Sequence, residues 1–234
     1  MTEAELLHTL GQVTTASITS LLLKQGLGNT WLRGPRPLRT GQPRAVGRAF
    51  TLRFIPGRED LAQPAGLATL RNTRAAIEAM PAGCMVVADA MGTADVGVFG
   101  DILCSRMRIL GVAALVTDGA VRDQAGVLAS GLSVWSRGIA APPPMGGLTF
   151  INWGEPIGCG GVAIFPGDMI VADDDGAVAI PAALVEFIAE QAPELERLEA
   201  WVMTEVEAGV PLPGLYPPNA ETQARYAAFL AQQG

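Results

Sequence analysis

The segment that indicates the fold is DILCSRMRILGVAALVTDGAVRDQAGVLASGLSVW, residues 101–135. Its apolar periodicity switches repeatedly between the helical and the strand pattern. In order, it predicts a helix over 101–110, a strand over 113–117, a helix over 123–129 and a strand over 132–135, and another apolar strand precedes it at 84–88. Strands that alternate with helices pair in parallel through right-handed crossovers. We therefore expect an α/β fold whose ligands bind beyond the carboxyl ends of the strands.

The flanking sequence predicts helices before this segment and short strands after it. Helical spacing of apolar residues, with a break near Gly11, spans residues 3–26, and a Gly- and Pro-rich loop follows over 28–45. The remaining predictions are a strand over 49–55, a helix over 66–80, and short strands at 156–157, 161–165, 169–172 and 177–180. The Asp175-Gly176 signal predicts a hairpin between the last two strands.

The C-terminal part changes character after residue 181. An acidic amphipathic helix over 182–208, interrupted at Pro193, precedes a Pro-rich stretch over 210–218 that we expect to be extended, and a last helix covers 220–232. We therefore divide the chain into an α/β domain, residues 1–185, and a C-terminal helix and extended arm, residues 186–234. The arm should pack on a neighbouring subunit, because alone it buries little surface.

Composition narrows the classes of partner. The 234 residues are 49% hydrophobic and 17% charged, with a formal net charge of −7, which is typical of one globular domain. Without a basic run, nucleic acid is not an expected ligand. No apolar stretch reaches the roughly 18 residues that a membrane span requires, and the acidic N-terminus does not resemble a secretory signal. We expect a cytoplasmic protein that binds no membrane.

Few residues are available for several common kinds of site. The three cysteines, Cys84, Cys104 and Cys159, form no C-x-x-C motif, so they are interpreted as buried free thiols. A single histidine, His8, excludes a Ser-His-Asp triad away from the N-terminus and a H-E-x-x-H zinc site. The aspartates at 173–175 are better explained by turn chemistry than by metal binding, and no phosphate-binding or dinucleotide-binding glycine motif is present.

Two carboxylates and one guanidinium stand out in the strand-to-helix connections. Asp101 precedes one predicted helix, and after twenty intervening residues Arg122 and Asp123 precede the next. Arg can grip a carboxylate bidentately, and Asp offers a hard oxygen to Mg²⁺ or Mn²⁺. The alternative is that Asp101 and Asp123 are only N-caps and that Arg122 is solvated. The free amides around Ile102, Leu103 and Cys104, together with the positive end of the helix dipole, are expected to form an anion site.

Several motifs together resemble the RraA-like family, and the resemblance covers residues 10–185. The motifs are Gly100-Asp101-Ile102-Leu103, Gly111-Val112-Ala113, Thr117 to Asp123, Pro166-Gly167-Asp168 and Asp174-Asp175-Gly176 with Ile180-Pro181. The family contains class II 4-hydroxy-4-methyl-2-oxoglutarate/4-carboxy-4-hydroxy-2-oxoadipate aldolases and proteins named regulators of ribonuclease E activity. The resemblance implies a swivelling β/β/α domain that assembles as a homotrimer or a hexamer, a dimer of trimers.

The resemblance also implies roles for individual residues. Asp123 would be the ligand of Mg²⁺ or Mn²⁺, Arg122 would clamp pyruvate, and Asp101 would hold a metal-bound water. The backbone from Gly100 through Ile102, Leu103 and Cys104 would bind the pyruvyl carboxylate. A neighbouring subunit would donate a Glu, for which the candidates are Glu194, Glu196 and Glu199. This chain departs from many relatives at Ser20, where they carry Asp, and its tail at 214–218 resembles a longer subgroup.

The leading hypothesis is a metal-dependent carbon–carbon lyase that cleaves a 4-hydroxy-2-oxo acid to pyruvate and an oxo compound. Decarboxylation of oxaloacetate passes through the same enolate and is an expected side activity. No lysine lies in the motif, which argues against a Schiff-base aldolase. The alternatives are a protein-binding regulator of ribonuclease E and a metal-dependent hydrolase of 2,4-dioxo acids.

Overall fold

An eight-stranded sheet forms the centre of the protein in a computed structural model, which describes residues 1–58 and 72–232. The strand order is β1-β7-β5-β3-β2-β10-β11, and β9 pairs beside β2. The bounds are β1 Arg36–Pro37, β2 Ala45–Pro56, β3 Met85–Asp89, β5 Ala114–Thr117, β7 Ser133–Ser136, β9 Leu148–Trp153, β10 Met169–Asp173 and β11 Gly176–Ile180. The strands β2, β3, β5 and β7 pair in parallel, which confirms the α/β prediction.

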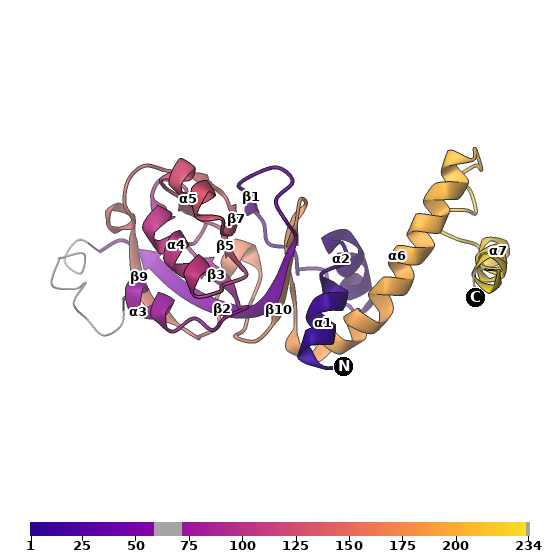
Figure 1. Cartoon of the computed structure of the whole chain (residues 1–234), viewed down its shortest axis with the longest axis horizontal. Coiled ribbons are helices and arrows are strands. Elements are labelled where there is room, and N and C mark those ends of the chain that lie inside the picture. The colour runs from indigo at the N-terminus through magenta and orange to yellow at the C-terminus, as the bar shows by residue number, and fades with distance from the viewer. Residues whose placement is uncertain (59–71, 233–234) are drawn as a thin grey trace.

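Three helices cover one face of the parallel strands (Figure 1). They are α3 Thr73–Glu78, α4 Asp101–Ile109 and α5 Gln124–Ser130. Val86 and Ala88 of β3 pack beneath these helices, whereas Met85 and Val87 point into a second cluster on the opposite face. Both faces are apolar because both are covered, as in other parallel sheets. The predicted helix at 66–80 is seen only as α3, since residues 59–71 lie outside the described part.

A second, small parallel sheet lies after the carboxyl ends of the main strands. Its strands β4 Gly97–Phe99, β6 Ala120–Val121 and β8 Gly138–Ile139 follow β3, β5 and β7 along the chain and pair in the order β4-β6-β8. None of the three is predicted from the sequence, because strands of two or three residues leave no periodic pattern. Since β4 and β6 are parallel neighbours, the residues that follow them meet at one edge.

The β10–β11 hairpin forms as predicted, with Asp173 paired to Gly176 across the turn. Three other predictions for this half are wrong. Residues 156–157 and 161–165 do not form strands, because Gly160 and Gly161 have positive φ and begin a turn that leaves only an isolated bridge between Ile157 and Ile164. The helix is also not interrupted at Pro193, since α6 Val185–Glu207 continues through it.

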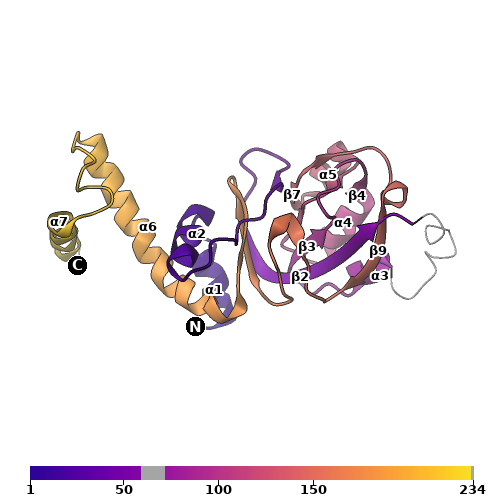
Figure 2. The ribbon, with the colours of Figure 1, turned by 180° about the vertical axis from the view of Figure 1, so that it is seen from behind.

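The N-terminal helices α1 Glu3–Leu10 and α2 Thr15–Lys24 pack with the first turns of α6 against β10 and β11. Figures 1 and 2 show this group at the end of the sheet away from α4 and α5. No single helix in the described ranges is long and apolar enough to cross a membrane. The bent pair α1 and α2 passes such a test when both helices are taken together, by length and composition only.

The distal part of α6 projects from the body and carries α7 Ala220–Ala231 at its end (Figure 1). Trp201, Val202, Leu215 and Tyr226 form a small separate core there. Residues 210–218 were expected to be extended, but they fold into turns in which the amides of Leu215 and Tyr216 donate to the carbonyl of Leu212. The turns form because they bury Leu215 in this core.

Candidate functional site

The ends of β4 and β6 bring Asp101, Arg122 and Asp123 to one pocket of about 430 Å³. Twenty residues lie between Asp101 and Arg122 in the sequence, and the parallel pairing of the short strands brings the two segments together. The pocket is lined by Asn72, Thr73, Arg74, Gly97, Val98, Gly100, Asp101, Ile102, Leu103, Arg122, Asp123, Pro143, Pro144 and Met145. A pocket of this size holds a small organic acid with room for its ordered water.

Arg122 and Asp123, the two residues that follow β6, form an ion pair with each other. The Arg122 Nε lies 2.9 Å from Asp123 Oδ2, and the two side chains are 38% and 44% exposed. Asp123 is at the N-cap position of α5 with φ 55°, but its carboxylate caps no amide of the helix. A left-handed conformation is uncommon for a residue with a side chain and is most frequent at functional positions. The interpretation of Asp123 as a side-chain N-cap is therefore wrong.

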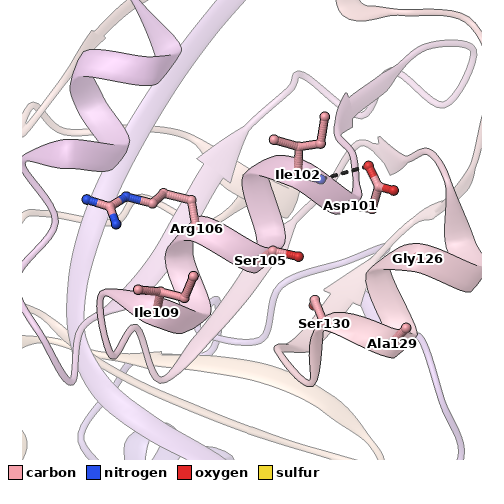
Figure 3. Close-up of a pocket in the computed structure, with 8 residues that line it drawn as sticks. All are labelled: Asp101, Ile102, Ser105, Arg106, Ile109, Gly126, Ala129 and Ser130. Carbon is pink, nitrogen blue, oxygen red and sulfur yellow. Dashed lines mark hydrogen bonds between the residues drawn. The ribbon is translucent and has the colours of Figure 1, made fainter.

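Asp101 is the first residue of α4, and Gly100 takes the N-cap position that the sequence suggested for Asp101. Its Oδ1 accepts a hydrogen bond of 2.7 Å from the amide of Ile102 (Figure 3). Among the described residues, no group donates to Asp101 Oδ2 or to Asp123 Oδ1. Each carboxylate therefore keeps one oxygen available for a ligand.

The expected amide cradle at the start of α4 is only partly available. The Cys104 amide donates to the carbonyl of Gly100 at 3.0 Å, so the expectation of a free amide there is wrong. The Ile102 amide is bonded to Asp101, whereas the Leu103 amide has no acceptor in the described part of the chain. The first turn of the helix closes one residue earlier than expected, because the helix begins after Gly100 rather than after Asp101.

Three glycines let the charged side chains approach the backbone. A Cβ on Gly126 would lie 2.6 Å from the Cβ of Asp101, and a Cβ on Gly100 would lie 2.6 Å from Asp123 Oδ2. A Cβ on Gly97 would lie 2.6 Å from the Cβ of Arg122. Figure 3 shows Gly126 in α5 facing Asp101 across the groove between α4 and α5. The roles of Gly97 and Gly126 are not visible in the sequence, because only the tertiary contacts leave no space for a side chain at these positions.

The chemistry of Asp101 and Asp123 fits a divalent cation. In the part of the chain that the structure describes, no three His, Cys, Asp or Glu residues gather to hold a metal. Two carboxylates with a free oxygen each are nevertheless a usual protein contribution to Mg²⁺ or Mn²⁺, which keep several waters and take further oxygens from substrate. These residues could therefore hold a hydrated cation together with a bound oxo acid.

None of the three glutamates considered as intersubunit donors lines this pocket. Glu194 pairs with Arg197 of its own helix, and Glu196 accepts hydrogen bonds of 2.7 and 2.8 Å from the amide and hydroxyl of Thr14. Burial raises the pKa of Glu199, and the nearby charge of Glu196 adds to the shift. Figure 1 shows their helix, α6, beyond β10 and away from α4. Within one chain these glutamates lie too far away to complete the site.

A second pair of aspartates lies beside Gly158–Gly161, and both of its members are buried. Asp118 accepts hydrogen bonds from the amides of Ala90, Gly92 and Gly160, and Asp89 accepts from Met91 and Gly158. Burial raises the pKa of Asp118, and these amides oppose that shift. The glycine loop is thus a structural partner of Asp89 and Asp118.

The cysteines are free and buried, as predicted. Burial raises the pKa of Cys84 to about 11 and that of Cys104 to about 12, with the charge of Asp101 adding to the second shift. Thiols in such surroundings stay protonated at neutral pH and are poor nucleophiles. The side chain of Cys104 is also fully buried, and Cys104 does not line the pocket.

Comparisons with known proteins identify the family of the chain. Residues 15–179 match the family model described as RraA-like, Aldolase/RraA. Over 120 residues the chain is 38% identical to a Halalkalibacterium halodurans protein provisionally named a 4-hydroxy-4-methyl-2-oxoglutarate aldolase. This alignment covers 51% of this chain and 56% of that protein. The chain is also 27% identical to Legionella pneumophila DlpA over 174 residues. That alignment covers 74% of this chain and 27% of the length of DlpA. The alignments thus span about half and about a quarter of these curated relatives.

A solved structure matches over almost its whole length. The crystal structure of Streptomyces coelicolor RraAS2, described as an unusual member of the RNase ES inhibitor RraA protein family, has a TM-score of 0.77 and 32% sequence identity. The match covers 86% of this chain and 96% of that chain. Because the match covers 86% of this chain, the likeness is not confined to the parallel strands and their helices.

Proposed function

Because this chain belongs to the RraA-like, Aldolase/RraA family, we propose that it is a carbon–carbon lyase that cleaves a 4-hydroxy-2-oxo acid to pyruvate and an oxo compound. The observation that carries the proposal is the meeting of Asp101, Arg122 and Asp123 in one pocket, where each carboxylate has one oxygen to which no described residue donates. Among the described residues, the side chain of Arg122 contacts an acceptor only through its Nε, which donates to Asp123, so its two terminal nitrogens would bind the carboxylate and the 2-oxo oxygen of a substrate.

The chain's own residues divide the reaction between binding and proton transfer. Arg122 would hold the 2-oxo acid end, and the free amide of Leu103 would donate to its carboxylate. Asp101 Oδ2 would take up the proton of the 4-hydroxyl, directly or through one water. The bond between C3 and C4 then breaks, its electron pair forms the enolate of pyruvate, and C4 becomes the carbonyl of the second product. Protonation of the enolate at C3 completes the reaction.

Mg²⁺ or Mn²⁺ held by Asp123 would supply Lewis-acid stabilisation of the negative charge that develops on the 2-oxo oxygen. Oxaloacetate, whose decarboxylation develops the same charge, is an expected second substrate. A neighbouring subunit of a homotrimer or hexamer would complete the site with a glutamate, because no described residue of this chain supplies a third carboxylate there.

The proposal is tested by pyruvate release from short 4-hydroxy-2-oxo acids with Mn²⁺, detected with lactate dehydrogenase. We expect exhaustive chelation to reduce the activity to background and added Mg²⁺ or Mn²⁺ to restore it. The Asp123→Asn variant should stay inactive at every metal concentration, and pyruvate added directly to the assay controls for effects of the chelator on the coupling enzyme. Full activity after chelation would exclude the role of the cation.

Regulation of an RNA-degrading enzyme is the second candidate, favoured by the match with an RNase ES inhibitor family member. Such a role needs a protein-binding surface rather than the pocket. A ribonuclease E cleavage assay with the wild type and with Asp123→Asn separates the two functions. Equal inhibition by both proteins, with no pyruvate release by the wild type, would favour the regulator.

A further inference from the structure

A separate pocket of about 510 Å³ shares no lining residue with the pocket at the ends of β4 and β6. Two guanidiniums, those of Arg33 and Arg137, line it together with the buried carboxylates of Asp89 and Asp118. The proposed lyase chemistry uses none of these side chains. The pocket therefore needs an explanation of its own.

The pairing of β1 with β7 brings the two arginines together. The strands are antiparallel, with Arg36 opposite Ser136, so the segment before β1 lies beside the segment after β7. Arg33 belongs to the first segment, and Arg137 directly follows β7. A Cβ on Gly34 would lie 3.7 Å from the Cδ of Arg137, so the Arg137 side chain runs past the backbone that carries Arg33. Two residues far apart in sequence thus present their guanidiniums to one volume.

Glycines leave the space that the two guanidiniums occupy. A Cβ on Gly92 would lie 2.8 Å from Nη1 of Arg137, and a Cβ on Gly161 would lie 3.2 Å from Nη1 of Arg33. Both glycines have positive φ, 68° and 76°, which residues with a side chain rarely adopt. Each of the two loops therefore accommodates one guanidinium, and a side chain at either glycine would crowd it.

Most donors of the two guanidiniums are unused within the described residues. The Arg137 side chain forms no hydrogen bond or ion pair there, and Arg33 donates only from Nη1 to Asn29, at 2.8 Å. Exposed arginines elsewhere do find a carboxylate, as Arg106 does with Glu78. An unpaired guanidinium beside a pocket is suited to an oxyanion, because its planar fork matches a carboxylate or a phosphate.

The carboxylates of the pocket do not take the place of that oxyanion. Five backbone amides donate to Asp89 and Asp118, at distances of 2.8 to 3.1 Å. These amide dipoles stabilise the negative charge of the two aspartates, and in the described structure neither aspartate pairs with Arg33 or Arg137. The pocket thus keeps two positive charges without an acidic partner, and a ligand with two negative charges matches them.

We propose that Arg33 and Arg137 form a second ligand site, which binds a small dianion, either a phosphate monoester or a dicarboxylate. Both kinds of ligand offer paired anionic oxygens to the guanidinium donors, and the pocket has room for a small organic anion. The site is separate from the pocket that holds Arg122. The inference does not depend on the proposed lyase function.

Calorimetric titration of the full chain at low ionic strength tests the site, with inorganic phosphate and succinate as separate probes. We expect the wild type to bind at least one probe. Arg33→Met and Arg137→Met should each weaken the binding of that probe by roughly tenfold, since each removes charged hydrogen bonds. Arg137→Lys should recover part of the loss, because the charge remains but the fork does not. The probe that binds more tightly identifies the class of ligand.

The matched control is Arg39→Met, which removes an exposed arginine of the same loop as Arg33 from outside the pocket. It should bind the probe like the wild type, and so should Arg122→Ala, which removes a guanidinium from the other pocket. Urea midpoints check the fold of the variants, and they should stay close to that of the wild type because Arg33 and Arg137 are both exposed.

Three results would overturn the assignment. The first is a wild type that binds neither phosphate nor succinate. The second is equal weakening in Arg39→Met, which would show that the probe responds to general surface charge. The third is a loss of binding in Arg122→Ala with full binding in Arg33→Met and Arg137→Met, which would place the anion in the other pocket.

Discussion

Two pairs of aspartates follow the same set of parallel strands, and they meet opposite fates. Asp89 and Asp118 directly follow or end β3 and β5 and are buried, and five backbone amides donate to them. Asp101 and Asp123 follow the short strands β4 and β6, remain accessible, and each keep an oxygen without a donor in the described part of the chain. Along the chain, the short strand β4 lies between Asp89 and Asp101, and the short strand β6 lies between Asp118 and Asp123.

The difference shows that burial and hydrogen-bond donors decide whether a carboxylate stabilises loops or can bind a ligand. A buried carboxylate whose oxygens are filled by amides fixes the loops that supply those amides, and a cation would have to displace them. A carboxylate with an open oxygen beside an arginine can exchange water for a ligand. Asp118 and Asp123 lie five residues apart in one motif, so sequence similarity alone does not separate these roles.

The largest expected effect is on stability, at the buried pair. Asp118→Ala leaves three amide donors from two loops without an acceptor, and each unsatisfied donor costs about 1 to 3 kcal/mol. We expect the free energy of unfolding to fall by about 3 kcal/mol or more in a urea titration. Asp118→Asn, which keeps one acceptor oxygen, should lose less. An unchanged midpoint in Asp118→Ala would remove the basis of the comparison.

The next effect is on activity, at the exposed pair. Arg122→Ala removes the proposed clamp, and we expect kcat/KM for pyruvate release to fall by roughly a hundredfold or more, the size of a charged bidentate contact. Arg122→Lys should recover only part of the loss, because an ammonium cannot bind in the same planar fork. Wild-type turnover in Arg122→Ala would refute the assignment of this residue.

The smallest expected effect is the change in the free energy of unfolding caused by Asp123→Asn. It is to be compared with the large loss expected for Asp118→Ala. Asn tolerates the left-handed conformation at φ 55°, and the ion pair that is lost is exposed. We expect the free energy of unfolding to change by about 0.5 kcal/mol or less while the metal-dependent activity disappears. A loss as large as that of Asp118→Ala would mean that Asp123 is a structural residue too.

Much of the fold could be predicted, because apolar runs and helical periodicity are local properties of the chain. The parallel strands β3, β5 and β7 and the helices α4 and α5 agree with their predicted bounds within about a residue. Pro193 was misleading because packing on α1 and α2 holds α6 continuous on either side of it. The strand at 161–165 was wrong because the glycines before it take positive φ to deliver an amide to Asp118.

The candidate site divides in the same way. Asp101, Arg122 and Asp123 could be named from residue type and spacing, since few side chains suit a cation or a carboxylate. The free oxygens, the engaged amide of Cys104 and the close approach of Gly126 could not, because each depends on a neighbour outside the motif or on where a helix begins. Arg74 lies in a helix without any motif and joined the site only through the pocket.

By itself the sequence determined which chemical groups are present and that strands and helices alternate, since both follow from residue identity and local periodicity. Only the tertiary structure decided which carboxylates accept hydrogen bonds on both oxygens and which keep an oxygen without a described donor. Hydrogen-bond donors come to Asp118 from Ala90, Gly92 and Gly160, far away along the chain, and no donor comes to one oxygen of Asp123 from the described residues. The availability of a side chain for chemistry is set by its neighbours in space, and folding brings those neighbours together.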